Sequence, residues 1–228
     1  MMTSATPDRY PPDTDRARLE RIGKKVRERL AANPSAYKVP KEGIELYAVG
    51  EFMTPAECEK MIALTEEKAK PSTVYDNADS KDFRTSYSGD VDPDDRFVKK
   101  ISRRIDDLLG IDPRFGEAIQ GQRYHLGQEF KPHHDWFHPG TSYYDMEMKR
   151  GGQRCYTAMV FLNEVEAGGT TDFTDLDLSI VPKPGVLLAW NNAKPDGETN
   201  WATIHAGTPV EAGVKYIITK WYRTRPWF

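Results

Sequence analysis

The chain has 228 residues, enough for one substantial domain with its own hydrophobic core. Its mean hydropathy of −0.69 lies on the polar side, but its 5 Trp, 11 Tyr and 9 Phe exclude a disordered chain. The formal charge of −3, from 32 basic and 35 acidic residues, gives no long-range attraction to nucleic acid or to anionic lipid, so we expect neither as a partner.

Residues 1–13 contain three prolines and many polar side chains, a composition typical of a flexible tail. This stretch lacks the apolar core of a secretory signal, and no segment approaches the roughly 20 apolar residues that cross a bilayer. The two cysteines, Cys58 and Cys155, show no sign of pairing. We therefore expect a reducing, cytoplasmic location.

An amphipathic helix is predicted over residues 15–32, followed by a strand over residues 43–52. In the helix, apolar residues recur at helical spacing, and seven basic residues lie among them in the stretch 16–29. A basic face of this kind could contact RNA or a membrane. We expect it instead to be the solvated outer face of the helix.

Two further helices are predicted before the middle of the chain. Thr54 is a good N-cap, Pro55 suits the first helical position, and Glu57 completes a capping box, so a helix should run from here to about Lys70. Another is expected over residues 94–109, where apolar side chains form one stripe. We interpret the apolar positions of this stripe as a packing surface rather than as a cofactor site.

After Phe115, short β-prone runs separated by Gly, Pro and Asn turns dominate the sequence. The runs cover residues 118–124, 156–162, 178–181, 186–190, 203–205 and 216–222. Many short strands with regular turns indicate a sandwich or closed barrel, jelly rolls included. Since no linker divides the helices from the strands, we expect an α+β chain with one domain over residues 14–228, made of helical support (14–115) and a β core (116–228).

The adjacent residues His133, His134 and Asp135 lie in a stretch, 130–137, that is predicted as a strand. Side chains alternate along a strand, so His133 and Asp135 should point the same way. An imidazole beside a carboxylate supplies two metal ligands, and His205 on a late strand is the natural third. Two His and one carboxylate form the facial triad of non-haem iron(II) oxygenases. A His-x-Asp pair alone is weak support, because chance pairs of this kind are common.

Lys215 lies in a strongly apolar predicted strand near the end of the chain. Burying a lysine is costly unless a countercharge meets it. One interpretation is a lysine that extends to the surface or pairs with one of the many acids. The other is a cation fixed deep in the barrel, where it binds the distal carboxylate of a dicarboxylic co-substrate.

A series of short motifs runs in order through residues 118–225, at 124–135, 154–157, 161–163, 168–173, 184–185, 190–191 and 205–210. With Lys215, these motifs resemble those of the prolyl 4-hydroxylase family of iron(II)- and 2-oxoglutarate-dependent oxygenases. The similarity extends more loosely back to about residue 44. Several spaced motifs in the right order are far more specific than any one of them.

The resemblance implies a bacterial-type, single catalytic domain whose core is a double-stranded β-helix (a cupin-like jelly roll) with N-terminal helices packed on one face. It implies that His133, Asp135 and His205 are the catalytic iron ligands. Lys215 then matches the residue that pairs with the distal carboxylate of 2-oxoglutarate. Tyr124 matches a tyrosine that hydrogen-bonds the same co-substrate.

The resemblance also implies substrate-binding residues. Arg84 resembles an arginine near the peptide groove, and Trp221 resembles a tryptophan beside the target proline. Arg223 stands where some peptide prolyl hydroxylases have histidine, which is a departure within the substrate site. Phe161 replaces a tyrosine found in many relatives, so one hydrogen bond to the co-substrate should be missing.

The activity that the resemblance implies is hydroxylation of an unactivated C–H bond, with iron(II) as cofactor and 2-oxoglutarate and O2 as co-substrates. The expected target is C4 of a prolyl residue in a peptide or protein, with succinate and CO2 as co-products. Ascorbate is expected to support the reaction by restoring oxidised iron.

Residues 138–153 are longer than a simple connection needs, and we interpret them as a mobile lid or substrate-gripping finger. Tyr143, Tyr144 and Met146 would then contact an extended peptide. The alternative is a tolerated insertion.

Two alternatives stay open at this point, and two others are disfavoured. The same chemistry could act on a free amino acid, such as proline, or on another side chain. A non-catalytic cupin-like module could bind metal or a small acid without turnover. A hydrolytic zinc site lacks an obvious general base, and a halogenase would ordinarily lack the carboxylate ligand that Asp135 supplies.

Overall fold

The computed structural model describes residues 15–72 and 83–227, so the predicted flexible tail, residues 1–13, lies outside the described residues. The helices of the described part are α1 (Arg16–Ala31), α2 (Pro55–Lys68), α3 (Arg96–Leu109), α4 (Tyr144–Arg150), and the 3-10 turns η1 (Pro113–Phe115), η2 (Thr174–Leu176) and η3 (Trp201–Thr203). None of the described helices is long and apolar enough to span a membrane.

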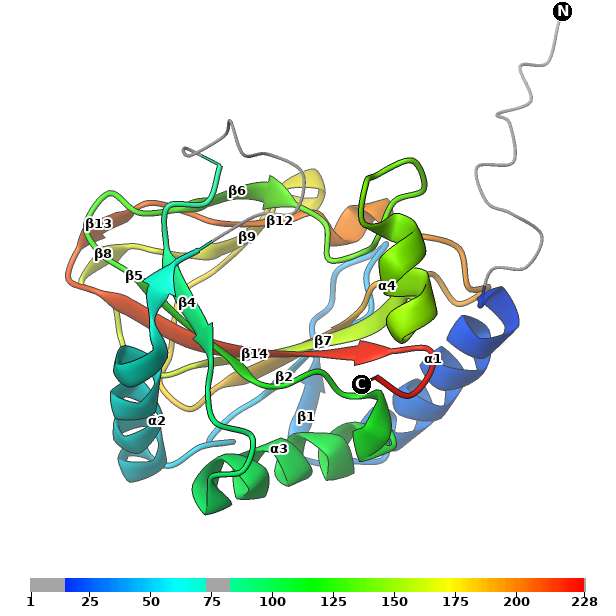
Figure 1. Cartoon of the computed structure of the whole chain (residues 1–228), viewed down its shortest axis with the longest axis horizontal. Coiled ribbons are helices and arrows are strands. Elements are labelled where there is room, and N and C mark those ends of the chain that lie inside the picture. Colours follow the sequence, from blue (N-terminus) through cyan, green and yellow to red (C-terminus); the bar gives the residue numbers. More distant parts are fainter. Residues whose placement is uncertain (1–14, 73–82, 228) are drawn as a thin grey trace, which may run out of the picture.

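Two facing antiparallel sheets form the predicted double-stranded β-helix (Figure 1). The large sheet has the order β1-β2-β11-β7-β14-β5-β4-β3, the small one β10-β9-β12-β6, and β13 pairs with β8. The strands of the large sheet are β1 (Ala36–Lys38), β2 (Leu46–Val49), β3 (Lys70–Pro71), β4 (Tyr87–Asp90), β5 (Gln120–Tyr124), β7 (Arg154–Phe161), β11 (Leu187–Asn191) and β14 (Lys215–Arg223). The others are β6 (Phe130–His133), β8 (Ala167–Gly168), β9 (Thr171–Phe173), β10 (Leu178–Ile180), β12 (His205–Gly207) and β13 (Val210–Ala212).

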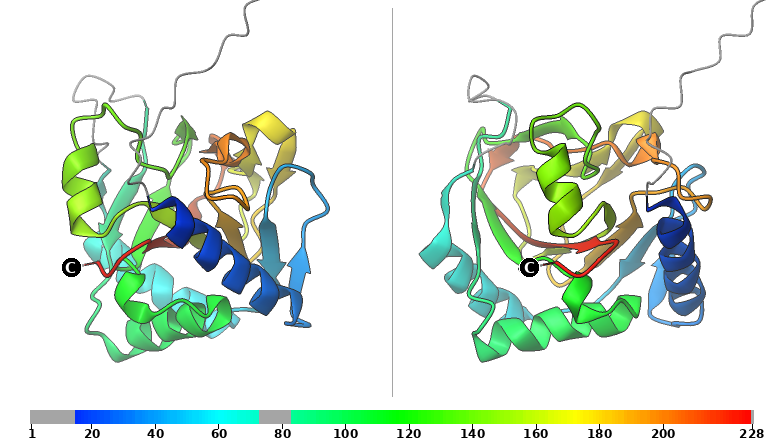
Figure 2. Two further views of the ribbon diagram at one scale, coloured as in Figure 1. Left: turned by 90° about the vertical axis from the view of Figure 1, so that its right-hand side faces the viewer. Right: turned by 45° about the vertical axis from the view of Figure 1, so that its right-hand side comes forward.

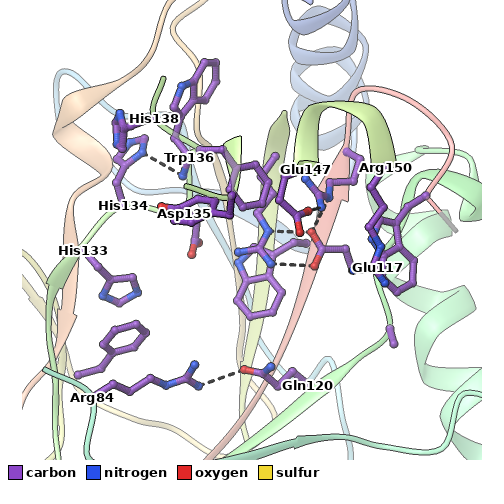
Figure 3. Close-up of a pocket in the computed structure, with 18 of the residues that line it drawn as sticks. Arg84, Glu117, Gln120, His133, His134, Asp135, Trp136, His138, Glu147 and Arg150 are labelled. Atoms are coloured by element: carbon purple, nitrogen blue, oxygen red, sulfur yellow. Dashed lines mark hydrogen bonds and ion pairs between the residues drawn. The ribbon is translucent and has the colours of Figure 1, made fainter. Parts of the chain in front are cut away.

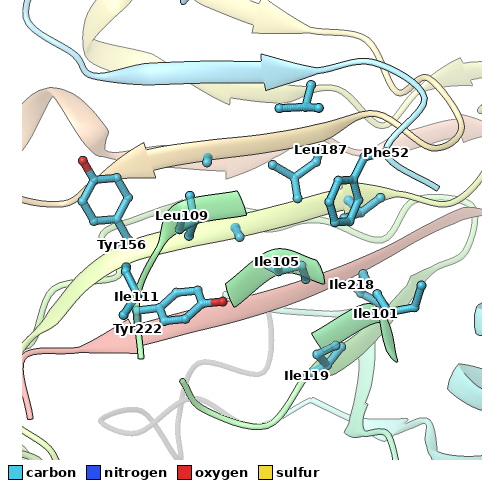
Figure 4. Packing of buried hydrophobic residues seen from close by; sticks show 14 of the residues in the cluster. Phe52, Ile101, Ile105, Leu109, Ile111, Ile119, Tyr156, Leu187, Ile218 and Tyr222 are labelled. Atoms are coloured by element: carbon cyan, nitrogen blue, oxygen red, sulfur yellow. The ribbon is translucent and has the colours of Figure 1, made fainter. Parts of the chain in front are cut away.

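Helices α1, α2 and α3 cover the outer face of the large sheet, and the small sheet lies on its other side (Figures 1 and 2). Figure 4 shows the packing on the outer side, where Ile101 and Ile105 of α3 meet Ile218 and Tyr222 of β14. A second apolar cluster fills the space between the sheets. The helices of the predicted support and the strands of the predicted β core therefore pack against each other through one apolar cluster, and a second cluster lies between the two sheets.

Strand β14 separates these two environments residue by residue, because successive side chains of a strand face opposite sides. Ile218 and Tyr222 belong to the helix-facing cluster, whereas Ile217 belongs to the cluster between the sheets. Lys215, Thr219 and Trp221 share the inner face with Ile217. The strand therefore presents a row of side chains to the interior of the β-helix.

A buried ion pair fastens α3 to the outer face of β14. Lys220 is 2% exposed and Asp106 is 3% exposed, and the ammonium contacts the carboxylate directly. Nζ of Lys220 also donates to Oγ of Ser102 at 2.7 Å, and the hydroxyl of Tyr222 donates to Asp106 at 2.6 Å. Each charge is thus buried together with an opposite charge and further hydrogen-bond partners.

The helix starts follow from local side-chain chemistry. The predicted capping box is present, since Oγ1 of Thr54 accepts from the backbone N–H of Glu57 at 3.2 Å and the Glu57 side chain accepts from the backbone N–H of Thr54 at 3.1 Å. Helix α3 starts two residues later than predicted, because Asp95 is its N-cap and accepts from the backbone N–H of Phe97 at 2.7 Å.

Three predicted strands were too long or misplaced. The predicted strand 130–137 ends at His133, because the backbone N–H of Trp136 donates to Nδ1 of His134 at 3.0 Å and forms a local turn in place of a sheet ladder. The strand expected over 43–52 covers only β2, and 203–205 holds the end of η3 and the first residue of β12. The extent of each strand is set by its pairing partner, which the sequence does not reveal.

Candidate active site

The three predicted iron ligands meet at the small sheet. His133 ends β6, Asp135 follows two residues later, and His205 begins β12 and pairs in register with His133. One ligand atom from each side chain lies within 4.8 Å of the others. Oδ2 of Asp135 is 3.9 Å from Nε2 of His205. The structure therefore brings together the three residues, and the donor set is the one expected for non-haem iron(II).

Backbone carbonyls fix the orientation of both imidazoles. Nδ1 of His133 lies 2.9 Å from the carbonyl oxygen of Lys131, and Nδ1 of His205 lies 2.9 Å from that of Thr203. A carbonyl only accepts, so each Nδ1 carries the proton and each Nε2 keeps a lone pair for a metal. Burial, together with His205, holds the pKa of His133 well below its usual value, so its ring is a neutral ligand at pH 7.

A chain of hydrogen bonds holds the carboxylate ligand. Oγ1 of Thr157 on β7 donates to Oδ2 of Asp135 at 2.7 Å and accepts from Nδ2 of Asn192 at 3.0 Å. Burial alone would raise the pKa of Asp135, but the two neighbouring imidazoles and Arg154 outweigh it and lower the pKa to about 2. Asp135 is therefore an oriented anion, which is the form that binds a cation.

Lys215 projects into a narrow cavity between the sheets and is 1% exposed. Its Nζ donates to the carbonyl oxygen of Thr170 at 3.1 Å and to Oγ1 of Thr171 at 3.3 Å. Within residues 15–72 and 83–227 this ammonium forms no ion pair, and burial lowers its pKa to about 7. A ligand carboxylate placed here would supply the missing charge and remove much of the cost of burial.

Polar groups on β5 and β14 line the same narrow cavity. The hydroxyl of Tyr124 donates to Oε1 of Gln122 at 2.7 Å, and Nε2 of Gln122 donates to Oγ1 of Thr219 at 3.1 Å. Nζ of Lys215 lies 5.5 Å from the centre of the Tyr124 ring and 5.9 Å from that of Phe161. Tyr124 is thus placed beside the lysine as predicted, and Phe161 adds only an apolar ring.

A second, much wider cavity of about 780 Å³ opens on the other side of the three ligands (Figure 3). Its polar lining contains both acids and arginines. Four residues line both cavities, namely Phe130, His133, Asp135 and Trp221. The metal site therefore lies where a narrow cavity with a buried cation meets a wide cavity with room for a larger molecule.

All three predicted substrate residues line this wide cavity, Arg84 and Trp221 among them. Nη2 of Arg84 donates to Oε1 of Gln120 at 3.0 Å (Figure 3), and its guanidinium carbon lies 4.7 Å from the centre of the Phe130 ring. The ring of Trp221 lies 4.1 Å from the guanidinium carbon of Arg154. Both predicted residues are close to the metal ligands, and both are held by protein partners.

Arg223, the third predicted substrate residue, also lines the wide cavity, but its guanidinium is more fully enclosed by protein groups. Its side chain is 1% exposed, and its guanidinium contacts Glu117, Glu147 and the carbonyl oxygen of Gly152. Two nitrogens of this group thus donate hydrogen bonds within the protein, and the third, Nε, has an ion-pair contact with Glu117. Residues 138–153, the predicted lid, contain helix α4, and of its three predicted peptide contacts Tyr143 lines the cavity, whereas Tyr144 and Met146 do not. The role of this segment as a lid stays a prediction.

Comparison with known proteins agrees with this geometry. The model of the 2OG-Fe(II) oxygenase superfamily matches residues 119–223, a span that contains all three candidate ligands and Lys215. The probable prolyl 4-hydroxylase 8 of Arabidopsis thaliana is 32% identical over 195 residues, which cover 75% of this chain and 66% of that protein. The chain belongs to the prolyl 4-hydroxylase family of 2-oxoglutarate- and iron(II)-dependent oxygenases.

Other members of this family differ in length. The prolyl 4-hydroxylase subunit alpha-2 of Gallus gallus is 31% identical over 180 residues, which cover 77% of this chain but 33% of that protein. The chain thus spans less than two thirds of the length of these curated relatives.

The viral collagen prolyl hydroxylase of Paramecium Bursaria Chlorella virus-1, solved with 2-oxoglutarate, has a similar structure. The comparison gives a TM-score of 0.60 and 25% identity, with 78% of this chain and 94% of that chain covered.

Several residues of this family member's site were missed by sequence reasoning. Thr157, Asn192 and Gln122 are buried polar residues in strands or loops, and the local sequence does not mark Asn192 or Gln122. The alternation of side chains between the two faces of a strand offered one clue, for Thr157. Thr157 lies on β7, and a polar residue facing the inside of an apolar strand needs a hydrogen-bond partner.

Proposed function

We propose that this protein is an iron(II)- and 2-oxoglutarate-dependent dioxygenase that hydroxylates a prolyl residue, at C4, in a peptide or protein, with succinate and CO2 as co-products. The observation that carries this proposal is the position of His133, Asp135 and His205 between the two cavities. The narrow cavity offers the buried ammonium of Lys215 to a carboxylate, and the wide cavity suits the molecule to be oxidised.

The residues of the chain have separate tasks in this proposal. His133, Asp135 and His205 would hold iron(II), which supplies the activation of O2 when bound. Lys215 would pair with the distal carboxylate of 2-oxoglutarate, so that the other end of the molecule faces the three ligands. Tyr124 would orient the same co-substrate from the neighbouring strand. The burial of this cavity excludes water from the reacting groups.

The size of the wide cavity favours a peptide over a free amino acid. A volume of about 780 Å³ lies in the upper part of the range of about 300–1,000 Å³ that is typical of ligand pockets. One free proline would leave most of this space filled with water. A segment of several residues would instead occupy it, with the target ring beside Trp221 and the metal ligands.

The test is production of succinate from 2-oxoglutarate with iron(II), with and without proline-containing peptides, in wild type, His133→Ala and Lys215→Ala. We expect peptide-stimulated succinate that disappears in His133→Ala and requires far more 2-oxoglutarate in Lys215→Ala. Stimulation by free proline or another amino acid, and not by peptides, would favour the same chemistry on a small substrate. Tight iron binding without turnover of any candidate would favour a binding module.

We also propose a cytoplasmic location and support of turnover by ascorbate. Cys58 and Cys155 are both buried as free thiols, which suits a reducing compartment. Ascorbate would keep the iron reduced when 2-oxoglutarate is consumed without product formation. Faster decline of succinate production in assays without ascorbate is the expected result.

A further inference from the structure

Helix α4 forms a wall of the wide cavity, but it is too short to be stable as a helix by itself. It has seven residues, and isolated helices shorter than about 12–15 residues are marginal in water. Glu147 and Arg150 of this helix line the cavity, and Figure 3 shows both across it from His133 and Asp135. The conformation and position of α4 must therefore be fixed by its tertiary contacts.

Those contacts come from the end of β14 and the residues after it. A guanidinium nitrogen of Arg223 contacts the carboxylate of Glu147, and Nη1 donates to the carbonyl oxygen of Gly152 at 2.7 Å. The guanidinium of Arg225 donates to the carbonyl oxygen of Met148. Side chains from one short stretch thus bind the helix in its middle and at its C-terminal end.

Arg223 connects this helix to the substrate side of the site. Its Nε lies 2.7 Å from Oε1 of Glu117, an ion-pair contact whose angle is too poor for a hydrogen bond. Glu117 in turn binds Arg154 through two bonds of 2.7 Å, and the ring of Trp221 lies over Arg154. The side chains of Arg223 and Glu147 are each 1% exposed, so this alternating chain of charges is shielded from solvent.

We propose that Arg223 is a positioning residue that, through Glu147, fixes the α4 wall and thereby determines which peptides the wide cavity accepts. This inference rests on the proposed function, in which the wide cavity receives the peptide. Arg223 lines the wide cavity, as expected from sequence, but its guanidinium is bound by protein groups, so it would act on substrate choice chiefly by placing the wall. Lys215 lies at the other end of β14, so the binding of 2-oxoglutarate should be independent of this contact.

The direct test is Glu147→Gln, with Asp145→Asn as the matched control, because Asp145 is an exposed acid on the same helix. We expect Glu147→Gln to raise the KM for peptide about tenfold or more and to leave the KM for 2-oxoglutarate within about twofold, since only the wall is released. Amide hydrogen exchange over residues 143–151 should become at least about tenfold faster. Asp145→Asn should match wild type in all three measurements.

If Glu147→Gln does not fold, the double variant Glu147→Met/Arg223→Met removes both buried charges and should restore folding, with the same rise in the KM for peptide. Equal behaviour of Glu147→Gln and Asp145→Asn would overturn the inference, as would parallel loss of peptide and 2-oxoglutarate affinity. A wild type that hydroxylates no peptide would refute the proposed substrate class instead. Hydrogen exchange would then decide by itself whether Glu147 anchors the wall.

Discussion

Two buried lysines on β14 have opposite relations to the protein around them. Lys220 faces the helices, and Asp106 on α3 neutralises it within the fold. Lys215, five positions earlier, faces the interior of the β-helix, and among the described residues its hydrogen-bond partners are one carbonyl and one hydroxyl. Both residues are at most 2% exposed.

The difference separates a structural charge from a binding charge. In a buried ion pair whose members also have hydrogen bonds, each charge is neutralised within the protein. Removal of one partner then leaves the other charge buried without compensation. A buried ammonium without a carboxylate is incomplete, and burial already lowers the pKa of Lys215 to about 7. The charge that would complete it is the distal carboxylate of 2-oxoglutarate, and the next four predictions test this contrast.

The largest effect is expected for stability in Lys220→Met. Asp106 would remain buried without its cation, which should lower the free energy of unfolding by about 3–5 kcal/mol. Urea denaturation measures this change, and the KM for 2-oxoglutarate should stay unchanged in the folded fraction. The double variant Lys220→Met/Asp106→Leu should recover most of the stability, and a fully stable single variant would contradict the contrast.

Lys215→Met should have the converse phenotype. Loss of a buried charge-assisted contact should raise the KM for 2-oxoglutarate about 100-fold, which corresponds to about 2.8 kcal/mol. The free energy of unfolding should stay the same or increase, because an unpaired buried charge is removed. Steady-state kinetics and urea denaturation of the same sample give both values. A loss of stability similar to that of Lys220→Met would show that Lys215 is structural.

The pH dependence of co-substrate binding should report the lowered pKa of Lys215. Below about pH 7 the free ammonium is already charged, so affinity for 2-oxoglutarate should be constant there. Above that value binding must take up a proton, and affinity should fall by up to about tenfold per pH unit. Calorimetry across pH 6–9 measures this slope. It should be absent in Lys215→Met, and an equal slope in that variant would assign the titration to another group.

The smallest effect is expected for Asp172→Asn. The negative charge of Asp172 raises the pKa of Lys215 against the effect of burial, and Asp172 accepts hydrogen bonds from Thr170 at 2.7 Å and Ser179 at 2.6 Å that an amide oxygen can keep. Its loss should weaken 2-oxoglutarate binding about two- to threefold at pH 8. At pH 6, where Lys215 is charged in either protein, the difference should vanish.

The sequence predicted those parts of the site that local pattern specifies. His133 and Asp135 lie two residues apart, and Lys215 is a charge within an apolar strand, so each is conspicuous in the sequence alone. The capping box at Thr54 was equally local and is present. His205 was the natural third ligand on a late strand, and the order of motifs then supported it and supplied the double-stranded β-helix.

Long-range partners could not be predicted in this way. Lys220 lies in the same strand as Lys215, but its counterion Asp106 is 114 residues away in sequence. The sequence therefore did not show that Lys220 is neutralised within the fold and that Lys215 is not. Helix α4 was missed because seven residues are too few to show a helical period, and its anchor Arg223 is 76 residues from Glu147. Tertiary contacts determine both features.

The central claim is that Lys215 binds the distal carboxylate of 2-oxoglutarate. Its most direct test is a double cycle that compares binding of 2-oxoglutarate and 2-oxopentanoate, which lacks that carboxylate, to metal-loaded wild type and Lys215→Met without O2. We predict that wild type prefers the diacid by about 100-fold and that the variant binds the two acids with nearly equal affinity. Equal loss of affinity for both acids in the variant would contradict the account.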